Sequence, residues 1–265
     1  MTIVAGFRVK DGVLLCADTM YSGDMKIYQP KIFRVETDEA KFGFALAGNE
    51  VYGKMAFQEC QKAVEQCPVG ERTKLRLIPI LRDVLQAVAE NYGNVKDPHL
   101  TRFDFLIAAW FKDGGAEFYY AQPPAMLSEG TFRCLGTGAY LGYHMITSAY
   151  EPDMPVHRAL ILATEALAAS KGHDVNCGGK SEFLLVRNDG VFSDLAHFNV
   201  AAAEECIAEY NRLSQQLLLD LGSLRTEEMD FSHQFNGFEE RIIGLRRTWK
   251  AKALTFHKLV EAARR

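Results

Sequence analysis

The 265-residue sequence opens with the run Thr2-Ile-Val-Ala-Gly-Phe-Arg-Val9, the turn Lys10-Asp-Gly12 and the run Val13-Leu-Leu-Cys-Ala-Asp18. Both runs are rich in β-branched and other apolar residues, which favour strands. The short connection between them contains a glycine, which can adopt a positive φ in a tight turn. This combination predicts a β-hairpin, so we expect regular structure to begin almost at residue 1.

Beyond this hairpin and the polar connection 19–30, blocks of predicted strands alternate with pairs of predicted helices. Alternating or short apolar runs predict strands at 31–35, 41–48, 103–111, 116–120, 132–135, 182–187 and 191–193. Apolar residues at helical spacing predict helices at 50–66, 75–92, 139–149 and 155–170. Segregated blocks favour antiparallel sheets over a parallel βαβ sheet. The expected fold class is therefore α+β, a four-layer α/β/β/α sandwich.

The pattern changes to helix alone from about residue 199. We therefore expect two domains, residues 1–198 and a helical C-terminal extension, residues 199–265. The last segment carries an apolar stripe at alternating spacings of three and four, made by Phe235, Phe238, Ile242, Leu245, Trp249, Ala253, Phe256 and Val260. Such a stripe packs either on the body of the same subunit or on a neighbouring subunit, and both readings stay open.

Composition excludes several classes of function. The net charge of −4 gives no electrostatic reason to expect nucleic acid or an anionic membrane as a partner. The six cysteines form no C-x-x-C pair and lie in apolar segments, as reduced thiols do. No run approaches the roughly 18 apolar residues of a membrane span, and no basic-then-apolar leader is seen. We expect a cytoplasmic protein.

Thr2 directly follows Met1, and this pair has a chemical consequence. Removal of Met1 would leave the Thr2 hydroxyl beside a free α-amine, whose ordinary pKa is about 7.7–8.0. One residue would then supply both a nucleophile and its base. Taken alone the signal is weak, because threonine is a common strand residue.

Six motifs occur together in one order along the chain, over about 2–193. They are Thr2-Ile-Val-Ala-Gly6, Lys10-Asp-Gly-Val-Leu-Leu-Cys-Ala-Asp18-Thr19, Lys31-Ile-Phe-Arg34, Leu46-Ala-Gly48, Gly136-Thr-Gly138 and Asp174-Val-Asn-Cys-Gly-Gly179. In this combination the chain resembles a proteasome β subunit, a threonine peptidase with the N-terminal-nucleophile (Ntn) hydrolase fold. Because no long propeptide is expected before Thr2, the resemblance is to bacterial proteasome-like or ancestral β-type subunits.

The resemblance implies a role for each residue of these motifs. Thr2 Oγ1 would attack the scissile carbonyl, Lys31 would lower the pKa of that hydroxyl, and Asp18 would hold Lys31 in place. The N–H of Gly48 would stabilise the oxyanion. Without the resemblance, Asp18 would be interpreted as a turn residue, Lys31 as a solvated strand residue and Gly48 as a turn glycine.

Thr137, Asp174 and Cys177 match the group that orients the free amine in the family, and Leu46 and Thr19 match its substrate-binding positions. The family has a serine where this chain has Cys177, a weaker hydrogen-bond donor. The segment after Asp18 also lacks the arginine common there in the family. These departures put catalytic efficiency in question and leave the expected fold unchanged.

The first hypothesis is thus a threonine-type endopeptidase that hydrolyses unfolded polypeptides inside a homo-oligomeric ring, with an ATPase unfoldase left open as a partner. Two alternatives are a non-catalytic, proteasome-like scaffold subunit and an Ntn amidase acting on a small amide. The seven histidines show no metal-ligand spacing, and no Gly-rich phosphate loop is present. We therefore expect no metal and no cofactor.

Overall fold

The computed structural model describes residues 2–22, 25–92, 101–194, 197–223 and 227–262. The chain divides into two compact units, Met1–Leu195 and Ala196–Arg265. The first unit contains both large sheets and all the predicted site residues. The second contains two helices, α5 (His197–Leu221) and α6 (Glu228–Ala262), which pack against each other.

The first large sheet has five strands in the order β10-β1-β2-β11-β12, and every neighbouring pair is antiparallel. Its strands are β1 (Val4–Val9), β2 (Gly12–Asp18), β10 (Phe132–Leu135), β11 (Ser181–Arg187) and β12 (Phe192–Asp194). The predicted N-terminal hairpin is confirmed as β1 and β2, in which Val9 pairs with Gly12. In the β2–β11 register Asp18 pairs with Ser181, so the end of β2 meets the start of β11.

The second large sheet has the order β5-β6-β7-β8-β9 and is also antiparallel throughout. Its strands are β5 (Ile32–Glu36), β6 (Ala40–Gly48), β7 (Phe103–Phe111), β8 (Gly115–Gln122) and β9 (Ala125–Ser128). Lys31 immediately precedes β5, and Gly48 is the last residue of β6. The two segments are joined by a hydrogen bond of 2.9 Å from the Leu46 amide to the Lys31 carbonyl.

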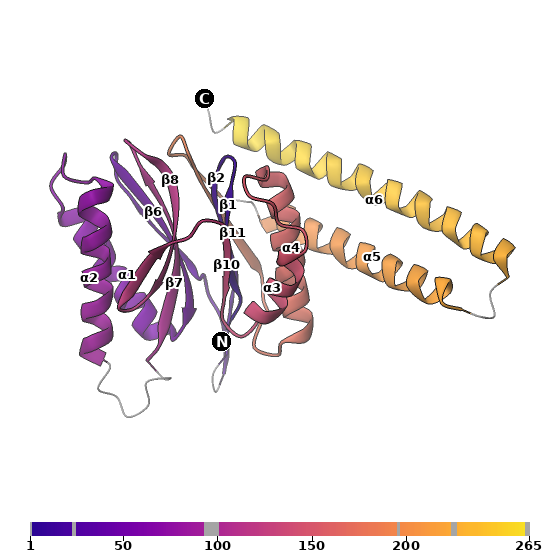
Figure 1. The fold of residues 1–265 in the computed structure, drawn as a ribbon, viewed down its shortest axis with the longest axis horizontal. Coiled ribbons are helices and arrows are strands. Elements are labelled where there is room, and N and C mark those ends of the chain that lie inside the picture. The colour runs from indigo at the N-terminus through magenta and orange to yellow at the C-terminus, as the bar shows by residue number, and fades with distance from the viewer. Residues whose placement is uncertain (1, 23–24, 93–100, 195–196, 224–226, 263–265) are drawn as a thin grey trace. The chain divides into compact units, whose positions relative to one another are not determined.

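The two sheets stack face to face, with one helix pair on each outer side (Figure 1). Helices α1 (Glu50–Gln66) and α2 (Lys74–Tyr92) cover the second sheet, and α3 (Ala139–Thr147) and α4 (Val156–His173) cover the first. This arrangement confirms the predicted four-layer α/β/β/α sandwich. It follows from strands that have two buried faces, one toward the opposite sheet and one toward the helices.

Apolar side chains fill the space between the sheets, where Leu15 and Leu184 of the first sheet meet Leu106 and Phe118 of the second. Gly6 of β1 is required here, because a Cβ at this position would lie 2.6 Å from a ring carbon of Phe118. The absence of a side chain on one strand thus admits an aromatic ring from the opposite sheet.

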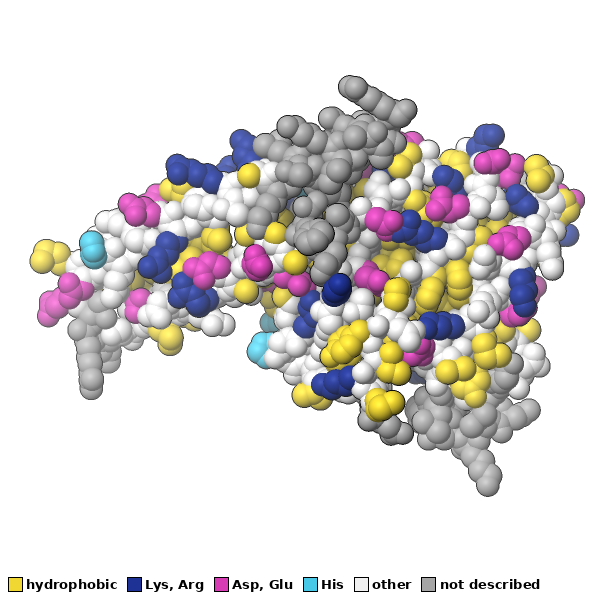
Figure 2. All heavy atoms as spheres, turned by 180° about the vertical axis from the view of Figure 1, so that it is seen from behind, with side chains coloured by type: hydrophobic (Ala, Val, Ile, Leu, Met, Phe, Trp, Pro, Cys, Tyr) yellow, Lys and Arg dark blue, Asp and Glu magenta, His cyan; other side chains and the backbone are white. Residues whose placement is uncertain are grey.

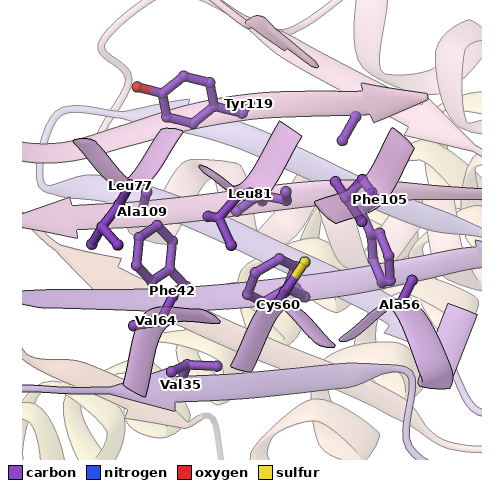
Figure 3. Close-up of a cluster of buried hydrophobic side chains, with 14 of the residues drawn as sticks. Val35, Phe42, Ala56, Cys60, Val64, Leu77, Leu81, Phe105, Ala109 and Tyr119 are labelled. Carbon is purple, nitrogen blue, oxygen red and sulfur yellow. The ribbon is translucent and has the colours of Figure 1, made fainter. Parts of the chain in front are cut away.

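A second apolar cluster lies between the second sheet and its helices (Figure 3). Phe42 and Phe105 project from neighbouring strands onto Cys60 of α1 and onto Leu77 and Leu81 of α2. All five side chains are fully buried. Burying a phenylalanine or leucine side chain contributes about 1.5–3 kcal/mol, so this layer stabilises the packing of the second sheet on its helices.

Three short strands differ from the prediction. The polar connection 19–30 contains a short hairpin, β3 (Met20–Ser22) and β4 (Lys26–Tyr28), and β9 was not predicted at all. The three residues of β4 are exposed and the four of β9 are exposed or partly exposed. Such short edge strands lack the buried apolar face that makes a strand recognisable in a sequence.

No described helix is long and apolar enough to cross a membrane. On the face seen in Figure 2, described Lys and Arg side chains are interspersed with Asp and Glu side chains rather than gathered by sign. This distribution agrees with the small net charge of the sequence.

Candidate active site

Thr2 lies just before β1 and is buried, with 2% of its surface exposed. Its carbonyl accepts a hydrogen bond of 3.2 Å from the Gly138 amide, at the start of α3. Gly136 has a φ of +92°, and a Cβ there would overlap the same carbonyl oxygen. The loop that follows β10 therefore packs directly on the Thr2 backbone, and only glycine permits this approach.

The hydroxyl of Thr2 lies between the side chains of Asp18 and Lys31. Lys31 Nζ donates to Thr2 Oγ1, which in turn donates to Asp18 Oδ1. Lys31 Nζ also lies 2.6 Å from Asp18 Oδ1, and both of these charged side chains are fully buried. Thr2 and Asp18 belong to the first-sheet side of the sandwich and Lys31 to the second, so the site forms only when the two sheets stack.

Asp18 accepts hydrogen bonds through both carboxylate oxygens. Oδ1 receives the amide of Ile3 at 3.1 Å in addition to Thr2 and Lys31, and Oδ2 receives the amide of Gly178 at 2.9 Å. A buried carboxylate is costly unless hydrogen bonds and an opposite charge compensate it, and here both are supplied. These contacts fix Asp18 beside the hydroxyl.

The ammonium of Lys31 makes two further contacts. It donates to the carbonyl of Met20 at 2.5 Å and lies 4.8 Å from the centre of the Tyr21 ring, a cation–π contact. Burial lowers the pKa of Lys31 below its ordinary value, while the charge of Asp18 and its hydrogen bond oppose this shift. The lysine thus depends on Asp18 to remain charged in a buried position.

Thr137, Asp174 and Cys177 form a second group next to the first. Burial alone would raise the pKa of Asp174, but hydrogen bonds from Thr137, Asn176 and Cys177 lower it. The Cys177 Sγ lies 3.6 Å from Asp174 Oδ2, and burial followed by the charges of Asp18 and Asp174 raises the pKa of this thiol to about 12. Cys177 is therefore a neutral, weak donor that lies close to both acids.

Gly48, Leu46 and Thr19 are placed differently. Gly48 is exposed and has a φ of +100°, and a Cβ there would overlap the carbonyl oxygen of Arg102. Leu46 is fully buried under Gly53 of α1, so it offers no exposed surface to a substrate in this structure. Thr19 bonds away from Thr2: its backbone groups bond to Lys180 and Gln29, and its hydroxyl accepts from the Lys180 amide at 2.9 Å.

Two residues that surround Lys31 were not predicted from the sequence. Glu182 of β11 accepts a hydrogen bond of 2.9 Å from the Lys31 amide, and Tyr21 of β3 supplies the aromatic ring described above. The only sequence signal for Glu182 is a carboxylate next to an apolar run of four residues, 183–186. Tyr21 could not be recognised, because its strand was not predicted.

The chemistry of this site is that of an activated hydroxyl. A buried ammonium that donates to Thr2 Oγ1 favours the alkoxide form of that oxygen. In the described part of the chain no three His, Cys, Asp or Glu side chains gather in a way that would hold a metal ion. The side chains in place are those expected for nucleophilic attack by an alcohol.

Comparison with known proteins agrees with the fold. The proteasome subunit beta 2 of Pyrobaculum neutrophilum is 33% identical over 185 residues, which is 70% of this chain and 88% of that protein. Anbu (ancestral beta-subunit) from Yersinia bercovieri has a TM-score of 0.71 at 13% identity, covering 84% of this chain and 99% of that chain. The helical assembly of the Anbu complex from Pseudomonas aeruginosa has a TM-score of 0.66 at 15% identity, covering 81% and 96%.

The model of the family described as "Proteasome subunit" matches residues 2–186, which is more than half of the chain and spans every predicted site residue. The relatives of this chain include a proteasome subunit beta 2, and the solved structures of similar fold include an ancestral beta-subunit. The chain therefore belongs to the proteasome subunit family.

Proposed function

We propose that this chain is a threonine-type peptidase, with Thr2 as its N-terminal nucleophile once Met1 has been removed. The observation that carries the proposal is the convergence of Lys31 and Asp18 on the Thr2 hydroxyl, with all three side chains withdrawn from water. An exposed threonine at the start of a strand would need none of these partners. Membership of a family of peptidase subunits supports the same activity.

In the proposed mechanism, Thr2 Oγ1 attacks the carbonyl carbon of the scissile amide and its proton passes to the free α-amine of Thr2. The N–H of Gly48 donates to the oxyanion of the tetrahedral intermediate, a contribution of about 3 kcal/mol in comparable sites. The C–N bond then breaks, the α-ammonium protonates the leaving amine, and an ester to Thr2 remains. Water then attacks the ester carbonyl and gives a proton to the α-amine. As the ester C–O bond breaks, the α-ammonium passes this proton to Thr2 Oγ1, so the acid product leaves and the hydroxyl and neutral amine are restored.

Thr137, Asp174 and Cys177 complete the proposal as the group that orients the α-amine. The Gly138 amide that bonds to the Thr2 carbonyl comes from the same loop as Thr137, so this loop lies beside the Thr2 backbone. Leu46 and Thr19 remain predictions for substrate contact. Neither is open to a substrate here, because Leu46 is fully buried and the backbone groups and hydroxyl of Thr19 already bond within the chain.

The test combines intact-mass spectrometry with peptide hydrolysis by the purified protein. We expect the mass to correspond to a chain without Met1, and we expect Thr2→Ala to abolish the hydrolysis of peptides and of an unfolded protein. Retention of Met1 on essentially every chain would remove the proposed base. Full activity in Thr2→Ala would rule out the mechanism itself.

A non-catalytic scaffold subunit is the second candidate, and the thiol of Cys177 favours it. A thiol in place of a hydroxyl weakens the contact to Asp174 that would steady the amine. A β-lactone that acylates N-terminal threonine discriminates the two functions, since it would label Thr2 only in a competent site. Turnover of small amides without turnover of peptides would instead indicate an Ntn amidase.

We further propose that the peptidase works as a homo-oligomer in the cytoplasm, with its sites facing an enclosed chamber that admits unfolded polypeptide. A solved structure of similar fold is a helical assembly, so an open helical arrangement stands beside a closed ring. An ATPase unfoldase that feeds the chamber is a further candidate partner.

A further inference from the structure

Glu182 lies at the start of β11, one residue after the partner of Asp18. It is partly buried, and burial raises the pKa of its carboxyl above the usual range, while hydrogen bonds from the Lys31 and Ile32 amides oppose this shift. The carboxylate faces the charges of Lys31, Arg34 and Asp18 and the Tyr21 phenol. None of the roles assigned above uses this residue.

The carboxylate of Glu182 connects the two sheets through hydrogen bonds to the backbone at Lys31. Its Oε2 accepts from the Lys31 amide at 2.9 Å, and the following amide, that of Ile32, bonds to the same side chain. Glu182 belongs to the first sheet, whereas Ile32 is the first residue of β5 in the second sheet and Lys31 immediately precedes it. On the other side, the Lys31 carbonyl accepts from the Leu46 amide within the second sheet. The backbone of Lys31 is thus held from both sheets.

This attachment matters because the Lys31 side chain must reach across to residues of the first sheet. Its ammonium is 2.6 Å from Asp18 Oδ1 and donates to Thr2 Oγ1, contacts that a backbone shift of about 1 Å would break. A misplacement of that size can reduce an enzymatic rate by about two orders of magnitude. Hydrogen bonds to a charged group are among the stronger ones, so a carboxylate suits this task.

We propose that Glu182 is a positioning residue for the peptidase reaction, which it serves by fixing the backbone of Lys31 so that the ammonium reaches Thr2. The inference rests on the proposed function, in which Thr2 is the nucleophile. Glu182 itself touches neither the nucleophile nor the substrate in this account.

The experiment compares Glu182→Ala and Glu182→Gln in the full chain. The number of competent sites is first titrated with a β-lactone that acylates Thr2, and kcat is then expressed per competent site. We expect Glu182→Ala to lower kcat about tenfold with KM changed less than about twofold, and to slow β-lactone acylation by a similar factor. Glu182→Gln should restore most of the rate, because its amide oxygen can still accept from both backbone amides.

Glu36→Ala is the matched control, because Glu36 is an exposed carboxylate at the end of β5 that is far from Lys31. It should leave both rates unchanged. If Glu182 had a purely structural role, Glu182→Ala would lower the melting temperature and the number of competent sites but not the rate of each site. That result would overturn the proposal. A parent chain in which Thr2 is not acylated would overturn the peptidase function and this inference together, whereas an active parent with an equally fast Glu182→Ala would overturn only the inference.

Discussion

The side chain of Lys31 is an ammonium in an unusual position, fully buried and bonded to a hydroxyl, a carboxylate and a carbonyl. Desolvation lowers the pKa of such a group, and the adjacent negative charge of Asp18 raises the pKa again and so opposes this shift. If a charged Lys31 is needed to activate Thr2, activity must fall as the pH rises through the Lys31 pKa. The α-amine must be neutral to accept a proton, so activity must also fall as the pH drops through the pKa of that amine, whose ordinary value is about 7.7–8.0.

Asp18→Asn tests this electrostatic coupling. Because the charge of Asp18 raises the Lys31 pKa, its removal should lower that pKa and move the alkaline limb of the kcat/KM profile to lower pH. The measurement is the pH profile of peptide hydrolysis. Asp104→Asn, at a largely buried aspartate in β7, serves as the control and should leave the limb in place. An unchanged alkaline limb in Asp18→Asn would show that Lys31 does not set it.

Cys177→Ser tests whether the weak thiol contact limits the reaction. A hydroxyl is a stronger donor to Asp174 than a thiol, and a gain of about 0.5–1 kcal/mol in that hydrogen bond corresponds to a two- to fivefold rise in kcat. Steady-state kinetics of peptide hydrolysis measure the change. Cys60→Ser, in the apolar layer under α1, should lower stability and give no rise. A slower or unchanged Cys177→Ser enzyme would mean that Cys177 does not orient the amine.

Sequence reasoning identified Thr2, Asp18 and Lys31 because they stand in short motifs of a familiar order, and the structure places these three side chains in mutual contact. The same reasoning could not find Glu182. Its contact is to backbone amides of a segment about 150 positions away, and such contacts leave no trace in the residue types of either partner.

At the scale of elements, the loop between β10 and α3 packs against the backbone of Thr2. Gly136 and Gly70 have nearly the same φ, +92° and +89°, but different surroundings. A Cβ at Gly136 would overlap the Thr2 carbonyl oxygen, whereas a Cβ at Gly70 would meet nothing within 4 Å. Alanine substitutions at the two positions therefore distinguish the effect of backbone strain, which both share, from the effect of displacing Thr2, which only Gly136→Ala has.

We expect Gly136→Ala and Gly70→Ala to share a cost of about 1–2 kcal/mol for an alanine at positive φ. Gly136→Ala should in addition lower kcat by at least about tenfold, because Thr2 must move, while Gly70→Ala should keep the parent rate. Denaturant unfolding measures the first effect and peptide hydrolysis the second. Equal activity of the two variants would show that the loop does not position Thr2.

The regular elements with long apolar patterns were predicted from the sequence, whereas the short hairpin of β3 and β4 was not. Met20 and Tyr21 are buried in β3, but three residues are too few to show a strand period. This hairpin supplies the Met20 carbonyl and the Tyr21 ring to Lys31. The least predictable element of the fold is thus one that contacts the site.

At the scale of the whole molecule, the helix pair α5 and α6 leaves part of the predicted apolar stripe of α6 uncovered, at Phe235. Phe235 is 46% exposed, and its ring lies 6.4 Å from those of Phe231 and Phe238, which are partly buried. A row of aromatic rings in contact with water is typical of a surface that binds another protein. We propose a neighbouring subunit as the partner of this stripe, because the proposed function requires an oligomer. Packing on the body of the same subunit is the other reading that the sequence left open.

Phe235→Ser should then weaken assembly without unfolding the chain. Covering a phenylalanine contributes about 1.5–3 kcal/mol, so its loss should weaken each subunit contact by roughly ten- to a hundredfold and shift the population to smaller species. Native mass spectrometry against protein concentration measures the shift, and circular dichroism checks that helix content is kept. Val69→Ser, at an apolar side chain 73% exposed between α1 and α2, should assemble like the parent. If Phe235→Ser also assembles like the parent, the stripe does not face a second copy, and its partner must be sought within the same chain.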